Sequence, residues 1–272
     1  MLKVVLIVGV ALILGGGLIY GAAYAIGERR NDANTGDFQQ AFQQTANLLN
    51  LKVNVEIGRV NINRSSGSEI TIDAKDIIEE NFTSEIVNDT LEVSYRQRRS
   101  ALGFISIPGI TTGRRTPVIN INIPEGMIFE NVDIDGGVGE YNIEYIHADS
   151  LVLSSGVGKI NVSDSRIDRL RVDAGVGETN IRGDIGEMNI SGGIGRITVT
   201  GSVARDIRVN GGVGEIRLDL AGDISNYNVS ADSGIGAVRI NGERADYFIR
   251  NTNAPYRLTA SGGVGSITIN IN

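Results

Sequence analysis

The chain lacks cysteine and tryptophan and holds one histidine, His147, so several kinds of site lose their usual side chains. Without cysteine there is no disulfide, no thiol nucleophile and no iron–sulfur ligand, and one histidine leaves few ligands for zinc. Aromatic residues make up only 5% of the sequence, which argues against the aromatic subsites of a polysaccharide-cleaving β-helix. The net charge of −7 argues against general nucleic-acid binding.

Glycine is the residue in excess, with 36 among 272 residues, about twice the average usage. The glycines follow no Gly-X-Y period, which excludes collagen. Hydrophobic residues reach 41%, so the chain has enough apolar surface to fold and is not a disordered low-complexity sequence. The positions of the glycines along the chain should therefore indicate what the excess is for.

An uncharged apolar run occupies residues 4–26, between Lys3 and the sequence Glu28-Arg29-Arg30. At 1.5 Å per residue a helix of this length spans roughly 30 Å of hydrocarbon. We interpret residues 1–30 as a transmembrane anchor. A cleavable signal peptide is the alternative, because Ala23-Tyr24-Ala25 fits a small-x-small cleavage site. The flanking charges oppose one another and leave the topology open.

Residues 31–50 are polar and rich in glutamine. Phe38, Phe42, Ala46 and Leu49 recur at helical spacing, and Asp37 is a candidate N-cap. This segment predicts a short linker followed by an amphipathic helix that caps the domain after it.

A Gly-Val/Ile-Gly pattern, followed by alternating apolar residues, repeats from Val138 onward at intervals of about 19 residues. A unit of this size cannot bury an apolar face alone, but stacked units bury a continuous column. We therefore expect an all-β fold in which residues 51–272 form a single-stranded parallel β-helix. We favour a right-handed coil. Insertions are expected at 77–131 and 246–257. The second glycines, read as tight turns between strands, are Gly58, Gly139, Gly158, Gly177, Gly195, Gly214, Gly236 and Gly265.

Outward positions after these glycines form two ladders if the units stack. Directly after the glycine the charge alternates, and two places further asparagine recurs at Asn142, Asn161 and Asn180. We interpret both ladders as structural, with a binding face as the alternative. The charged ladder consists of Glu140, Lys159, Glu178, Arg196 and Glu215.

A basic, apolar segment interrupts the pattern between residues 96 and 116. It carries five arginines and no acid, around an apolar stretch at residues 101–108. Such a segment suits lipid headgroups, an anionic envelope polymer or another envelope protein. A long loop folded back on the solenoid with solvated arginines is the alternative. The candidate binding residues are Arg96, Arg98, Arg99, Phe104, Ile105, Arg114 and Arg115.

The sequence stops directly after an alternating stretch at residues 269–272. A terminal strand leaves an edge that is usually covered or used for association. We therefore expect a homo-oligomer through this open edge, and a scaffold of solenoids stacked end to end is the corresponding alternative function.

The sequence contains only incomplete versions of known metal-binding and nucleotide-binding motifs. Gly136-Gly137-Val138-Gly139 resembles a calcium-binding nonapeptide, but Tyr141 occupies the aspartate position and the period is wrong. The Gly-x-Gly pairs lack the third glycine of a dinucleotide fingerprint and a Walker lysine. We expect no catalytic residue, cofactor or metal, and a carbohydrate-active enzyme is the less favoured alternative.

Three features occur together: the Gly-rich apolar segment ending at Gly27, the stretch Ile119-Asn120-Ile121-Asn122-Ile123-Pro124-Glu125-Gly126, and the iterated Gly-Val-Gly-x-Ile motif. In these the chain resembles the bacterial putative-adhesin family, a domain of unknown function. The resemblance covers residues 50–272 and brings no catalytic residues. It implies a membrane-anchored, extracytoplasmic β-solenoid that is adhesin-like, envelope-binding or associated with envelope stress.

Overall fold

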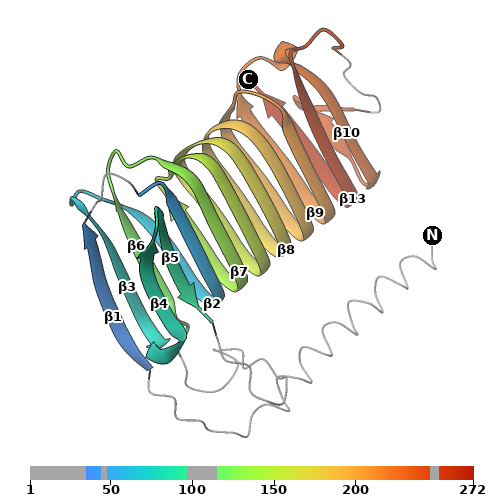
Figure 1. Ribbon diagram of the computed structural model, residues 1–272. Coiled ribbons are helices and arrows are strands. Elements are labelled where there is room, and N and C mark those ends of the chain that lie inside the picture. Colours follow the sequence, from blue (N-terminus) through green and yellow to red (C-terminus); the bar gives the residue numbers. More distant parts are fainter. Residues whose placement is uncertain (1–34, 44–47, 97–114, 246–250) are drawn as a thin grey trace, which may run out of the picture.

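The computed structural model describes residues 35–43, 48–96, 115–245 and 251–272, and these residues form one long column of stacked strands (Figure 1). The predicted all-β class is confirmed. The strands are β1 Thr35–Gln43, β2 Asn50–Ser65, β3 Glu69–Ile78, β4 Phe82–Val87, β5 Thr90–Tyr95, β6 Val118–Pro124, β7 Phe129–Glu144, β8 His147–Val203, β9 Ile207–Ala221, β10 Tyr227–Ile235, β11 Val238–Ile240, β12 Glu243–Arg244 and β13 Tyr256–Ile271. Two 3₁₀ turns complete the described elements, η1 Glu79–Asn81 and η2 Ile224–Asn226.

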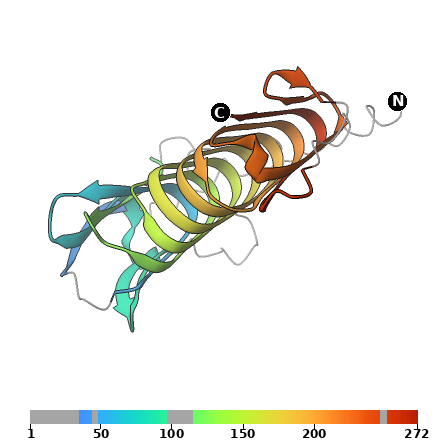
Figure 2. The same cartoon turned by 90° about the horizontal axis from the view of Figure 1, so that it is seen from above.

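The middle of the column consists of parallel rungs spaced 18 or 19 residues apart in the chain. Val132 of β7 pairs with Leu151 of β8, and Met188 of β8 pairs with Ile207 of β9. β8 is 57 residues long and passes three corner glycines without a break, so its coils follow one another along the column in Figures 1 and 2. The handedness of the coil stays a prediction.

The core is a set of apolar columns inside the coil. Leu151, Leu153, Ile160 and Val162 of one rung are between 0% and 2% exposed, whereas Val152 and Asn161, which alternate with them, are half-buried. Burying one such side chain contributes roughly 1.5–3 kcal/mol. Because every rung repeats this alternation, the stacked rungs bury a continuous apolar interior that a single repeat lacks.

The rungs at both ends stack out of sequence order. β2 pairs with β7 on one side and with β5 and β6 on the other. β13 pairs with β9 on one side and with β10 and β11 on the other. An outer rung from a different part of the chain therefore covers each of these two strands. β5 and β6 cover β2, and β10 and β11 cover β13.

The N-terminal end of the column carries an antiparallel cap. β5 lies along the first half of β2 and β6 along the second half, so together they form the outermost parallel rung. β4 adds antiparallel to β5, β3 adds antiparallel to β6, and β1 adds antiparallel to β3. The insertion predicted at 77–131 thus supplies the outermost rung and part of this cap.

The amphipathic helix predicted after residue 37 is wrong over residues 37–43, which lie in β1. Phe38 and Phe42 are four residues apart, a spacing that places two side chains on one face of a helix and also on one face of a strand. Both are half-buried against the core, and the rings of Phe38 and Phe82 lie 4.9 Å apart. Backbone pairing with β3 decides between the two periods, because β3 would otherwise present an unpaired edge.

The open C-terminal edge predicted from the sequence is also wrong. Residues 258–271 of β13 pair with β9, and most of the opposite edge of β13 pairs with β10 and β11. The last residue is held too, since the backbone N–H of Asn272 donates to the carbonyl of Leu220 at 3.1 Å. The edge at this end belongs instead to β10 and the β11–β12 hairpin.

Two predicted segments fall partly or wholly outside the described residues. Residues 1–30, the predicted anchor, lie outside them, and within the described ranges no helix is long and apolar enough to cross a membrane. The second predicted insertion, 246–257, connects β12 to β13, and its residues 246–250 are likewise outside the described part.

Candidate functional site

Glycines line one sharp corner of the column. A Cβ on Gly214 would overlap the carbonyl oxygen of Gly195 in the rung beneath, and Gly214 has a φ of +143°. Both the close backbone approach and the dihedral therefore require glycine. The same contact relates each corner glycine to the next, in the order Gly58, Gly139, Gly158, Gly177, Gly195, Gly214, Gly265 and Gly236.

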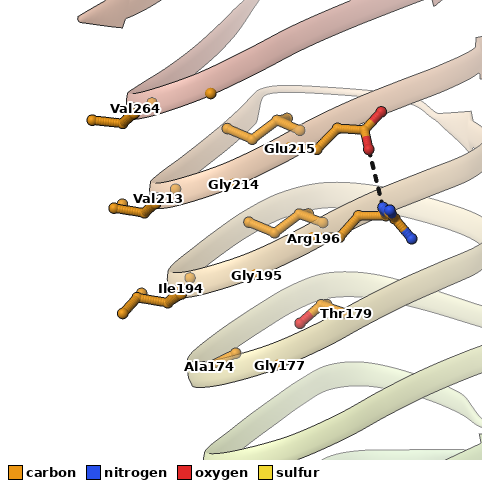
Figure 3. A pocket seen from close by; sticks show the side chains of 18 of the residues that line it. Ala174, Gly177, Thr179, Ile194, Gly195, Arg196, Val213, Gly214, Glu215 and Val264 are labelled. Atoms are coloured by element: carbon orange, nitrogen blue, oxygen red, sulfur yellow. Dashed lines mark hydrogen bonds and ion pairs between the residues drawn. The ribbon is translucent and has the colours of Figure 1, made fainter. Parts of the chain in front are cut away.

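The residue between the two glycines of each corner points away from the column. In Figure 3, Ile194, Val213 and Val264 project outward from successive turns. We call this row of exposed apolar side chains the corner ridge, and its members are 37–60% exposed. In stacking order they are Val138, Val157, Val176, Ile194, Val213, Val264 and Ile235.

The inner side of the corner is crowded. A Cβ on Gly136 would overlap the ring of Tyr141, and one on Gly192 would lie 2.9 Å from Cδ1 of Ile197. The inward residue at this point is therefore small because the side chain five positions later fills the same space. Where that later residue is the shorter Thr179, Ala174 takes the place of glycine. A narrow hollow remains beside Ala174 and Thr179, with space for water rather than for a small-molecule ligand (Figure 3).

Beside the corner ridge runs the charged ladder. Lys159 Nζ lies 3.6 Å from Glu178 Oε2, and Arg196 bridges Glu178 at 3.6 Å and Glu215 at 3.0 Å. Arg59 extends the ladder by pairing with Glu140 at 2.9 Å. The side chains are one third to one half exposed, so each pair contributes little to stability, about 0–1 kcal/mol. The alternation of sign nevertheless disfavours a slip by one rung, which would place like charges on neighbouring rungs.

A second ladder of asparagine amides runs parallel to the charged one. Asn180 donates to Asn161 at 3.0 Å, Asn161 to Asn142 at 2.7 Å, and Asn142 to Asn61 at 3.0 Å. Asn61 donates in turn to Asn120 of the outermost rung. Each amide oxygen is thus used by the next rung, which is the structural role expected of this ladder.

The predicted basic segment begins and ends at one corner of the outermost rung. Arg96 follows β5, Arg115 precedes β6, and both side chains are exposed. Their neighbours hold the two stubs in place, since the Arg96 N–H donates to the Asn81 carbonyl at 3.1 Å and the Arg59 N–H to the Pro117 carbonyl at 2.8 Å. The other predicted binding residues, Arg98, Arg99, Phe104, Ile105 and Arg114, lie outside the described residues.

Titratable groups in the described ranges do not gather into a metal site. No group of three histidine or carboxylate side chains there could hold a metal ion. Burial, with help from the nearby Asp135 carboxylate, raises the pKa of the Tyr141 hydroxyl well above its usual value. That hydroxyl donates to the Val55 carbonyl at 3.0 Å, which gives it a structural partner.

Sequence reasoning missed the corner ridge. The valine before each second glycine shares the two-residue period of the core, and so it reads as a buried position. Val176 is nevertheless 46% exposed. The signal that identifies it is the glycine on each side, because a residue between two tight-turn glycines lies at the tip of the corner.

Comparison with known proteins places the described column in a family. The sequence profile of the Toastrack DUF4097 family matches residues 48–254. No curated protein matches the chain. Among solved structures, a putative cell adhesion protein from Clostridium sporogenes is 18% identical with a TM-score of 0.47, and the match covers 88% of this chain and all of that one.

Two further solved structures are similar over nearly the same share of the chain. A putative adhesin from Bacteroides fragilis is 14% identical, with a TM-score of 0.40, and the match covers 88% of this chain and 98% of that one. A putative lipid binding protein from Parabacteroides distasonis is 14% identical, also with a TM-score of 0.40, and the match covers 89% of this chain and all of that one.

Proposed function

The chain belongs to the Toastrack DUF4097 family, and from that premise we propose that it is a non-enzymatic, adhesin-like module that binds a phosphate-bearing surface of the cell envelope. The family resemblance drawn from the sequence is thereby confirmed at the level of a family of unknown function. The distant solved structures carry no weight in this proposal. It rests on the basic segment and its place in the fold.

The observation that carries the proposal is a cationic segment without aspartate or glutamate. Its two ends are hydrogen-bonded to the N-terminal part of the column. Residues 94–124 include five arginines and no aspartate or glutamate, within a chain of net charge −7. Most arginines of the ladders, by contrast, are paired with carboxylates, as Arg196 is with Glu178 and Glu215. Binding residues are commonly carried on loops that a rigid scaffold positions, and here backbone hydrogen bonds at Arg96 and Pro117 hold both stubs.

Arginine clusters select phosphate because the planar guanidinium donates two parallel hydrogen bonds to one anion. The apolar stretch at residues 101–108 between the arginines adds side chains that can enter a lipid interface. Lipid headgroups and a phosphodiester wall polymer share this phosphate chemistry. An acidic protein offers carboxylates instead and is the alternative partner.

The membrane anchor at residues 1–30 and an extracytoplasmic column are parts of the same proposal. The uncharged run of residues 4–26 is long enough to span the hydrocarbon layer. Only about eight residues separate this run from β1, so the N-terminal cap and the basic segment would lie near the membrane that holds the anchor.

Binding is tested with the full chain in nanodiscs of neutral phosphatidylcholine, mixed with vesicles that contain phosphatidylglycerol or with a phosphodiester wall polymer. Replacing Arg98, Arg99, Arg114 and Arg115 by serine should weaken binding at least tenfold, since each basic residue near an anionic surface contributes about 1 kcal/mol. The matched control replaces four exposed arginines elsewhere, Arg166, Arg169, Arg182 and Arg208. Equal losses in both variants, or no loss in either, would refute the proposed site.

The anchor is tested by extracting membranes at alkaline pH and weighing the mature chain by mass spectrometry. An anchored protein stays in the membrane pellet with residues 1–30 intact. A chain that begins after Ala25 and is released into the medium would show a cleaved signal peptide. That result would remove the anchor but leave the phosphate-binding test unaffected.

A further inference from the structure

The corner ridge gathers the exposed apolar side chains of the described residues into one line. Seven of the nine exposed large hydrophobic residues belong to it, and the other two are Val87 and Ile128. At the usual strand spacing the seven side chains extend over about 30 Å. Single exposed apolar residues are ordinary on a protein surface, but a continuous line of them marks an interaction surface.

The fold does not explain the valines and isoleucines of the corner ridge. Close backbone approach requires the glycines on either side, as at Gly214, whereas the side chain between them points into solvent (Figure 3). A polar residue at this tip would meet no steric obstacle. Seven corners nevertheless carry valine or isoleucine there.

The charged ladder beside the corner ridge indicates the occupant. In stacking order its members are Arg59, Glu140, Lys159, Glu178, Arg196 and Glu215, so the sign alternates over six rungs. Reversing the order of such a ladder gives its electrostatic complement. Reversal of order is what a two-fold axis perpendicular to the column produces, and this axis also keeps the charged ladders of the two copies on the same side of the seam.

We propose that the corner ridge is the seam of an antiparallel homodimer, with the two-fold axis midway between the rungs of Val157 and Val176. Val157 then meets Val176 of the second copy, and Val138 meets Ile194. On the charged ladder Lys159 faces Glu178, Glu140 faces Arg196, and Arg59 faces Glu215 of the second copy. All six charges of each copy are thus opposite a charge of the other sign.

The ladder also excludes neighbouring registers. Moving the axis onto the rung of Val157 would place Lys159 opposite Lys159 and Glu140 opposite Glu178, so every facing pair would repel. A second copy also has the same rung spacing, which keeps the four ridge residues that meet in step, while Val213, Val264 and Ile235 lie beyond the contacts between the two ridges. A partner with a different repeat would fall out of step within a few rungs.

This interface differs from the end-to-end association expected from the sequence, because it uses the side of the column and leaves β13 within its own sheet. The inference does not depend on phosphate binding by the basic segment. The seam is narrow, so we expect a weak dimer in dilute solution and stronger association where anchored chains are concentrated in one membrane.

Cysteine crosslinking in the full chain tests the geometry, since the natural sequence has no cysteine to interfere. A Val138→Cys chain mixed with an Ile194→Cys chain should form a disulfide under mild oxidation. The Val138→Cys chain alone should not, because its two cysteines would lie three rungs apart, beyond disulfide reach. Self-crosslinking of Val138→Cys would show a parallel pair and overturn the proposal.

Charge reversal in mixed dimers tests the register. Lys159→Glu and Glu178→Lys should each weaken self-association at least tenfold, because each places two like-charge contacts in the seam. Mixing the two variants restores both contacts as opposite charges, so the mixture should associate nearly as tightly as the natural chain. A damaged fold cannot be repaired by mixing, and thermal melts of each variant check that it is folded. Failure of the folded variants to rescue one another, or a natural chain that stays monomeric in nanodiscs at all protein densities, would overturn the proposal.

Discussion

The middle of the column and its two ends obey different rules. From β7 to β9 each rung pairs with the one that follows it in the chain, and contacts recur every 18 or 19 residues. At the ends the paired residues are far apart: Leu51 lies on Val132, and Ile207 on Leu258. Local repetition is thus enough for the middle, whereas the ends depend on pairings between distant segments. The predictions below test this difference in order of decreasing effect.

The largest effect should follow from removing β13. A chain that stops at Asn253 leaves β10 and β11 without the strand they pair with and exposes the side of β9. We expect the C-terminal end to unravel while the middle stays folded, because each middle rung is supported by its sequential neighbours. Limited proteolysis should give a resistant fragment that ends near Ala221. Protection of residues 227–244 in the shortened chain would contradict the predicted role of β13.

A corner glycine of the middle should be the most sensitive single position. Gly195→Ala places a methyl group against the Gly177 carbonyl at a φ of +143°, and we expect a loss of about 4 kcal/mol in unfolding free energy. Gly222 has nearly the same φ but nothing within 4 Å, so Gly222→Ala isolates the dihedral strain, about 1 kcal/mol. Urea unfolding followed by circular dichroism compares the two. Equal losses would show that backbone contact between rungs is unimportant.

The charged ladder should contribute less. Lys159→Glu puts three carboxylates on consecutive rungs, Glu140, position 159 and Glu178, and should cost about 0.5–1 kcal/mol. Arg208→Glu is the matched control, because the same change of charge meets Asn189 and Thr259 on the adjoining rungs. The difference in thermal midpoint should shrink in high salt. If the thermal midpoint of Lys159→Glu were no lower than that of Arg208→Glu, the charged ladder would not contribute to the register of the rungs.

The smallest effect concerns the junction of β9 with β13. Burial opposes ionisation of Asp219, but hydrogen bonds from Arg217 and Asn270 outweigh it and hold the pKa of Asp219 below its usual value. A carboxylate with a lowered folded-state pKa stabilises the fold above its unfolded pKa, near 4, and this contribution is lost as the pH falls through the folded-state value. The advantage of the natural chain over Asp219→Asn should therefore decline from pH 5 to pH 2.5. An advantage independent of pH would contradict the assignment.

The same contrast explains what the sequence could reveal. The glycine period predicted the coil of the middle, and the outward phase predicted both the charged and the asparagine ladders, because these features recur every 18 or 19 residues along the chain. The pairing of β13 between β9 and β10 could not be deduced, since any two repeats have similar pairing faces and nothing local says which will meet. Phe38 and Phe42 misled for a related reason, because four-residue spacing fits both a helix and a strand.

The sequence revealed one of the two candidate surfaces, the basic segment, but not the other, the corner ridge. Charge composition alone identified the basic segment, because five arginines without an acid stand out in an acidic chain. The corner ridge stayed hidden, because Val157 has the same phase as buried Leu151 and Leu153, and only the turn around it reverses its direction. A period therefore predicts which residues share a line, but the backbone at the corner decides whether that line faces inward.

The position of β13 has a consequence for the timing of folding during synthesis. The rung that it fills lies between β9 and β10, both of which leave the ribosome or the translocation channel earlier. Until β13 emerges, the growing chain has a vacant place between β9 and β10. Completion of the column therefore waits for a strand made after both of its neighbours, and a polypeptide stalled before β13 would expose unpaired strands that proteases can recognise.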